Sequence, residues 1–307
     1  MIQSLDPARE NFLANLELIQ RRIANDQTQL SSGYRINKAS DSPGEVGDVV
    51  QLSSDVARAL QVQKNLQTAQ GTVSTAQSVL QSATQLLDQI RSEGAQGAGS
   101  TQTAAARSVL ATEIAQQLSQ LVDISRTTYG GIYVFSGDNP NQPQYQVDTA
   151  SATGVDRLFT TQATTLAQDV NGVSFLTGKT AQDIFDHRNP DDSLAPDNVF
   201  SAVNSLQIAL ANNNTAGITS ALNGLQTASD YLNQQLGFYG AVQNRLDSSL
   251  ANAQQVEVQW QTSLGKIRDT DVAAVSTDMT AAETNQQAAL AAQGQMPRQT
   301  LFEFLSG

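Results

Sequence analysis

The sequence predicts a mainly α-helical protein: an elongated helical bundle or coiled-coil rod with a small β-rich domain inserted into it. An apolar heptad pattern runs from Ile218 to Ile267 without a slip or a proline, and a second seven-residue repeat joins Leu52 to Leu87. These two repeats predict the rod. The composition of residues 129–200 predicts the insert, because this stretch holds many of the aromatic side chains and prolines of the chain.

The longest expected helix covers residues 218–267 and would be about 75 Å long at roughly 1.5 Å per residue. Such a helix cannot bury its apolar stripe against itself, so other helices must pack along it. Ser229, Gln243 and Glu257 interrupt one of its two seam rows, and polar residues in a seam restrict the register. The other row is apolar throughout: Ile218, Leu225, Leu232, Tyr239, Leu246, Ala253, Trp260 and Ile267.

Residues 1–48 are expected to form an N-terminal assembly helix followed by a loop. Asp6-Pro7 is typical of a helix start, and the helix should end near Gly33. Asp26 occupies one position of its apolar seam, so the helix is imperfect alone. The seam is otherwise apolar: Leu5, Phe12, Leu16, Ile19, Ile23 and Leu30.

Two interpretations of residues 30–47 stay open. The stretch is polar and rich in Gly, Ser and Asp, which is typical of a simple connecting loop. It could instead be a recognition segment of defined shape, because Arg35 and Lys38 face Asp41 and Glu45 nearby in the sequence.

Residues 49–130 are expected to be the outgoing part of the rod. A long helix covers 49–90, a breaker or loop follows at 92–103, and a third helix ends at Gly130-Gly131.

Residues 131–197 are expected to be the small β-rich outer domain. Residues 132–135 should pair with 144–147, and further strands are expected at 157–161 and 163–170. Asn171-Gly172 is a hairpin signal before another short strand.

The chain then returns to helix. Residues 198–267 form the return part of the rod, and 268–307 form a C-terminal assembly helix with a thin stripe that ends near Gly294. Four large apolar residues follow close to the last position, and an apolar end of this kind usually docks on another surface.

The composition limits the possible partners and chemistry. A net charge of −12 disfavours nucleic acid and anionic membrane surfaces as partners. The chain has no cysteine, no apolar run long enough to insert into a membrane, and no secretory signal in its first residues.

No motif indicates an enzyme or a cofactor. His187 is the only histidine, and a metal site with Asp183, Asp186, Asp191 and Asp192 can be imagined around it. The simpler interpretation is a solvated acidic loop, because one histidine with carboxylates at these spacings matches no known ligand pattern. We therefore expect no catalytic, cofactor or metal site.

Two distant segments carry a family resemblance. LSSGYRINKASDSPGEVGDVVQL (30–52) and SLGKIRDTDVAAVSTDMTAAETNQQAALAAQGQMPRQTLFEFL (263–305) resemble the two ends of bacterial flagellins and of flagellar hook-filament junction proteins. The resemblance covers roughly 1–130 and 198–307. TYGGIYVFSGDNPNQPQY (128–145) looks like the junction type, whereas GAVQNRL (240–246) leans toward flagellin.

This resemblance implies a structural subunit of the bacterial flagellum, most like the hook-filament junction protein, with a flagellin-like filament subunit as the alternative. Subunits of this family leave the cell through the flagellar type III export channel and assemble helically outside it. The implied partners are further copies of the chain, hook-associated proteins, flagellin and an export chaperone. A secreted coiled-coil adaptor explains the heptads but not the two terminal signatures.

We expect the assembly interface to lie at the two ends of the chain and in the 30–47 segment. The candidate residues are Leu5, Phe12, Leu16, Ile19, Ile23, Arg35, Asn37, Asp41, Val275, Met279, Leu301, Phe302, Phe304 and Leu305.

Overall fold

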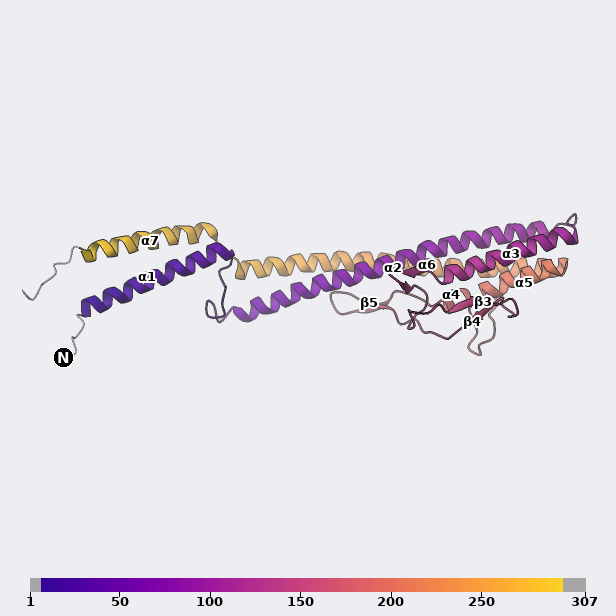
Figure 1. Ribbon diagram of the computed structural model, residues 1–307, viewed down its shortest axis with the longest axis horizontal. Helices are drawn as coiled ribbons and strands as arrows, with labels where there is room; N and C mark the ends of the chain where they lie inside the picture. The colour runs from indigo at the N-terminus through magenta and orange to yellow at the C-terminus, as the bar shows by residue number, and fades with distance from the viewer. Residues whose placement is uncertain (1–6, 295–307) are drawn as a thin grey trace, which may run out of the picture. The chain divides into compact units, whose positions relative to one another are not determined.

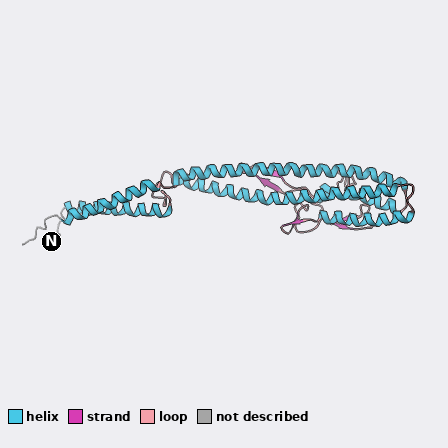
Figure 2. Cartoon of the chain, turned by 90° about the horizontal axis from the view of Figure 1, so that it is seen from above, coloured by secondary structure: helices cyan, strands magenta, loops and turns pink. Residues whose placement is uncertain are grey.

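The computed structural model describes residues 7–294, which are mainly helical with a few short strands (Figures 1 and 2). The prediction of a mainly α-helical fold is confirmed. The chain divides into two compact units: residues 1–57 with 257–307, and residues 58–256. The five-part division expected from the sequence stays a prediction, because these units group the segments differently without testing each boundary.

The first unit is built on helices α1 (Pro7–Ser32) and α7 (Val272–Gly294), which pack against each other (Figure 1). Helix α1 ends as expected at Gly33, which adopts a positive φ of 74°. The chain segments beyond the two helix ends are joined by backbone hydrogen bonds: the Thr270 N–H donates to the Gly33 carbonyl at 3.0 Å, and the Arg35 N–H donates to the Arg268 carbonyl at 2.7 Å.

The second unit contains most of two long helices, α2 (Val46–Ala98) and α6 (Thr215–Arg268), which run side by side (Figures 1 and 2). The long helix expected at 218–267 is therefore confirmed. Its apolar row is buried from Ile218 through Ala253. Helix α2 contributes an alternation of large residues and alanines to the same core: Ala59, Leu66, Val73, Ala76, Leu80, Ala83, Leu87 and Ile90.

Three shorter helices complete this unit: α3 (Ala104–Ser125), α4 (Ala181–Phe185) and α5 (Val199–Ala211). Helices α3 and α5 pack against each other. Thr103 caps α3, and Thr180 with Asp183 forms a capping box on α4, so the start of each helix is fixed by a local side chain. Helix α4 was not expected from the sequence.

Two helix boundaries expected from the sequence are wrong. Residues 92–98 continue helix α2, because Gly94 and Gly97 lie under the leucines of α5 and α6 and the missing side chains make room for them. Helix α3 stops at Ser125 rather than at Gly130-Gly131. Those two glycines have φ of 59° and 85° and form the turn of a short hairpin instead.

The β structure is three separate antiparallel pairs. They are β1 (Thr128–Tyr129) with β2 (Ile132–Tyr133), β3 (Tyr145–Val147) with β4 (Val155–Arg157), and β5 (Leu166–Gln168) with β6 (Ser174–Leu176). The Asn171-Gly172 hairpin is confirmed. The pairing of 132–135 with 144–147 is wrong, because the glycine turn lets 132–133 pair with the residues just before it. The strands are also shorter than expected at 157–161 and 163–170.

Within residues 7–294, no helix is both long enough and apolar enough to cross a membrane.

Candidate assembly interface

The terminal pair, α1 with α7, brings together six of the predicted interface residues. Along α1 the half-buried side chains recur at spacings of four and three, while the residues between them are exposed. The half-buried candidates are Phe12, Leu16, Ile19, Ile23, Val275 and Met279. Leu5, Leu301, Phe302, Phe304 and Leu305 lie outside the described residues.

The core of the terminal pair is thin. Ala282 is the one fully buried side chain on α7 among the residues that the structure describes, and the rest of its inner stripe is only half-buried and includes two glutamines, Gln286 and Gln293. A short helix with so little buried apolar surface is marginal in water. Large apolar side chains also remain exposed on the outside of the pair, including Leu13, Leu18, Val272 and Leu290. The pair therefore has apolar surface left for further contacts.

The segment after α1 has a defined shape. One guanidinium nitrogen of Arg35 donates to the Glu45 carboxylate at 2.6 Å and to the Ile267 carbonyl at 2.7 Å. The Asp41 carboxylate accepts the backbone N–H groups of Asn37 and Lys38 at 2.9 and 2.7 Å. These bonds hold the segment in one conformation and attach it to the end of α6. A defined shape is what the interpretation of residues 30–47 as a recognition segment requires.

The electrostatics of this segment follow from the same bonds. The two backbone N–H donors lower the pKa of Asp41. The pKa of Glu45 is lowered first by the Ser42 hydroxyl and then by Arg35. Both carboxylates therefore stay ionised and keep their hydrogen bonds well below neutral pH.

A polar pocket of about 180 Å³ opens between the end of α1 and this segment. Arg35, Asn37 and Asp41 line it together with Lys38, so the structure brings three predicted interface residues to one place. The pocket has the size and polarity to take a polar side chain, and it offers no apolar wall for a larger group.

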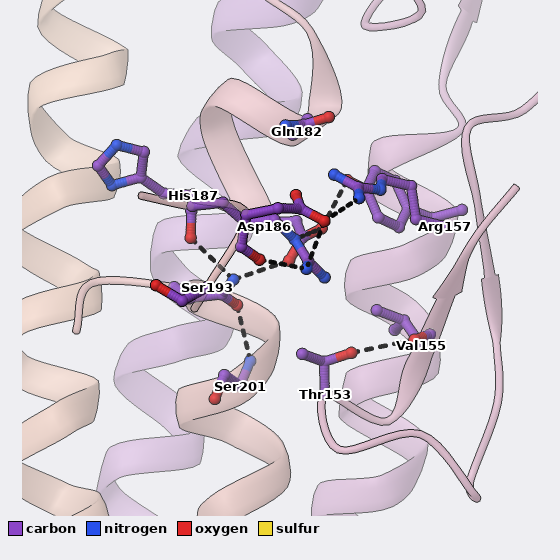
Figure 3. Close-up of polar contacts among 12 residues, drawn as sticks. Thr153, Val155, Arg157, Gln182, Asp186, His187, Ser193 and Ser201 are labelled. Carbon is purple, nitrogen blue, oxygen red and sulfur yellow. Dashed lines mark hydrogen bonds and ion pairs between the residues drawn. The ribbon is translucent and has the colours of Figure 1, made fainter. Parts of the chain in front are cut away.

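The outer region between α3 and α5 is held by a buried polar network (Figure 3). The Asp186 carboxylate is fully buried and accepts hydrogen bonds from Tyr145 Oη at 2.8 Å, Arg188 Nε at 2.9 Å and Asn198 Nδ2 at 2.7 Å. Burial, and then the Asp186 charge, raise the pKa of the Tyr145 hydroxyl, which therefore remains a donor.

This network corrects one part of the expectation of a solvated acidic loop at 183–192: Asp191 and Asp192 are exposed as expected, but Asp186 is buried. Asp186 is buried and hydrogen-bonded within the fold, and Asp183 caps α4. The His187 imidazole stacks on Tyr231 with ring centroids 4.6 Å apart, and its Nδ1 lies 2.7 Å from Asp197. No group of three or more metal-ligating side chains occurs within the described part of the chain.

Aromatic and cationic side chains fasten the outer region to α6. Phe135 contacts both Phe185 and Tyr239 edge to face, and the Arg245 guanidinium lies 4.1 Å from the centre of the Phe175 ring. Sequence reasoning missed these anchors. Tyr239 and Arg245 lie on α6, and their partners come from the distant β-rich stretch, so no local pattern connects them.

Comparison with known proteins matches both ends of the chain. A model of the bacterial flagellin N-terminal helical region matches residues 7–140, and a model of the bacterial flagellin C-terminal helical region matches residues 218–305. Flagellin B of Helicobacter pylori strain J99 is 32% identical over 44% of this chain, but the match spans only 26% of that longer protein.

Two other relatives align over most of their length. Flagellin of Halalkalibacterium halodurans is 23% identical over 96% of this chain and 94% of its own. Flagellar hook-associated protein 3 of Escherichia coli K12 is 27% identical over 77% of this chain and 82% of its own.

Solved structures share the fold. A putative flagellar hook-associated protein from Vibrio parahaemolyticus superposes with a TM-score of 0.64 at 18% identity, covering 75% of this chain and all of that one. Hook-associated protein 3 of Legionella pneumophila superposes with a TM-score of 0.60 at 14% identity, covering 71% of this chain and 98% of that one.

Proposed function

Because the chain belongs to the bacterial flagellin family, we propose that it is a structural subunit of the bacterial flagellum, and that it joins the hook to the filament. Its role is mechanical rather than enzymatic. The proposal places it outside the cell, where it assembles with further copies of itself, with hook-associated proteins and with flagellin. It would reach that place through the flagellar type III export system, with an export chaperone as an additional partner.

The observation that carries the junction assignment is the small insert between α3 and α5. Three short strand pairs and α4 form it, and buried contacts hold it on α6. The putative flagellar hook-associated protein from Vibrio parahaemolyticus is covered along its whole length by this chain. Because no part of that protein lacks a counterpart here, the coverage supports the view that the outer region of this chain is at least as large as the one in that protein.

One observation favours the alternative of a filament subunit. The flagellin of Halalkalibacterium halodurans has about the same length as this chain and aligns over nearly all of it. A filament subunit therefore does not need a larger outer domain than the one present here.

We further propose that assembly is carried by the terminal pair and the 33–45 segment. The half-buried seam of α1 and α7 would align the two helices, and their exposed leucines would contact neighbouring copies. The polar pocket beside Arg35 would receive a polar side chain from an adjacent subunit. An interface of this head-to-tail kind does not close on itself and generates a helical tube.

Electron microscopy of two mixtures tests the assignment. Purified chain is added to sheared filaments and, separately, to isolated hooks. A junction subunit binds the hook ends and does not elongate the filaments. Elongation of the filaments into long fibres made of this chain would identify a filament subunit instead.

A further inference from the structure

Asp26 is a buried carboxylate within the apolar seam of the terminal pair. It continues the row of Ile19 and Ile23 toward Leu30, and only 8% of its surface is exposed. Its Oδ2 oxygen is buried and has no hydrogen-bond partner among the described residues. A buried acceptor without a partner opposes folding, because it has lost its water and gained nothing in return.

The charges around Asp26 do not compensate for this burial. Arg22 lies one turn before it on α1, and Asp278 faces it from α7. The Arg22 guanidinium reaches across to the Asp278 carboxylate at 3.3 Å, so it forms an ion pair with the other acid. Asp278 carries the same sign as Asp26 and repels it.

We propose that the negative charge of Asp26 keeps the α1/α7 pair weak at neutral pH, and that neutralising this one charge closes the pair. This inference rests on the proposed function, because a subunit that passes through the type III export channel before it assembles benefits from a terminal pair that separates readily. The ionisation state of Asp26 then determines how strongly α1 and α7 pair.

The acid–base behaviour of the side chain supports the same direction. Burial raises the pKa of Asp26, Arg22 opposes that rise, and Asp278 adds to it. A carboxyl whose pKa is higher in the paired state takes up a proton on pairing. Ionisation of Asp26 therefore weakens the pair fully above that raised pKa, and the penalty is lost as the pH falls from there to below the ordinary pKa of an aspartate.

Amide hydrogen exchange of the full-length monomer, followed by mass spectrometry over residues 7–32 and 272–294, measures the strength of the pair. Asp26→Asn removes the charge, and Asp26→Leu removes both the charge and the need for a hydrogen-bond partner. At pH 7 we expect exchange in both helices to slow by roughly tenfold in Asp26→Leu. The ratio between variant and native chain should fall as the pH is lowered through the raised pKa of Asp26 toward the ordinary range of an aspartate.

Glu17→Gln is the matched control, because it removes the same charge from an exposed position of α1 whose ion pair with Arg21 lies in solvent. Its exchange should follow that of the native chain. Unchanged or faster exchange in Asp26→Leu would overturn the inference, as would an equal slowing in Glu17→Gln. The result is independent of hook binding, so this inference can fail while the junction assignment stands, and the reverse also holds.

Discussion

Single residues join parts of this chain that are far apart in the sequence. The Arg107 side chain on α3 is buried, and its guanidinium donates to the carbonyls of Gly97 and Gly99 at 2.8 and 3.0 Å and to Asn213 Oδ1 at 2.6 Å. It therefore ties the turn between α2 and α3 to the turn between α5 and α6. The sequence gives no hint of this role, since Arg107 looks like an ordinary polar position on a helix.

Arg107→Met should lower the free energy of unfolding by about 2–4 kcal/mol, because it removes three hydrogen bonds made by a buried guanidinium. The Gly99 carbonyl keeps a second donor, the Gln102 N–H at 3.2 Å. Urea unfolding followed by circular dichroism measures the loss. Arg91→Met is the control, because 40% of the Arg91 side chain is exposed and the Asp88 carboxylate lies 3.9 Å from its guanidinium. A loss in Arg107→Met no larger than in Arg91→Met would mean that the turns hold without this bridge.

At the level of elements, the sequence predicted the helices well where a heptad repeat was long, as in α6 and the first part of α2. The prediction failed where a residue type is explained by a contact with a distant segment of the chain. Gly94 and Gly97 looked like helix breakers, yet they are the places where leucines of α5 and α6 approach the α2 backbone. The half-buried seam of α1 and α7 was predictable from its spacing. The anchors of the outer region were not, because they depend on contacts between distant segments.

Gly94→Ala tests this account of the α2 helix. A Cβ atom at Gly94 would lie 2.7 Å from Leu206 Cδ2 and 2.9 Å from Leu222 Cδ2, so the new methyl group must push core leucines aside. We expect a loss of about 1–3 kcal/mol in unfolding free energy, although alanine is the better helix former. Gly240→Ala on α6 meets no atom within 4 Å and should stabilise the chain by up to about 1 kcal/mol. Equal effects at the two positions would contradict the packing argument.

Ile19→Asp tests the seam of the terminal pair. A charge at this half-buried position should open α1 and α7, raise their amide exchange and prevent incorporation into flagella, while α6 stays helical. Gln20→Asp places the same charge on the next residue, which is exposed and polar, and should leave exchange unchanged. Normal assembly of Ile19→Asp would show that the seam is not needed.

For the whole molecule, the net charge of −12 causes electrostatic repulsion between copies as they approach one another. Each added copy brings further negative charge, and repulsion between copies is screened over about 30 Å at 0.01 M salt but only about 10 Å at 0.1 M. Binding to hook ends should therefore be faster at 0.1 M salt than at 0.01 M. Light scattering and electron microscopy of hook mixtures provide the measurement. Slower binding at the higher salt would indicate that attractive ion pairs dominate the interface.

The position of the chain along an intact flagellum tests the central claim most directly. Antibodies raised against the outer region, residues 131–197, can be visualised by immunogold electron microscopy on flagella that retain their hooks. The account predicts label confined to a single narrow zone between hook and filament. Label spread along the length of the filament would contradict it and identify the chain as a filament subunit.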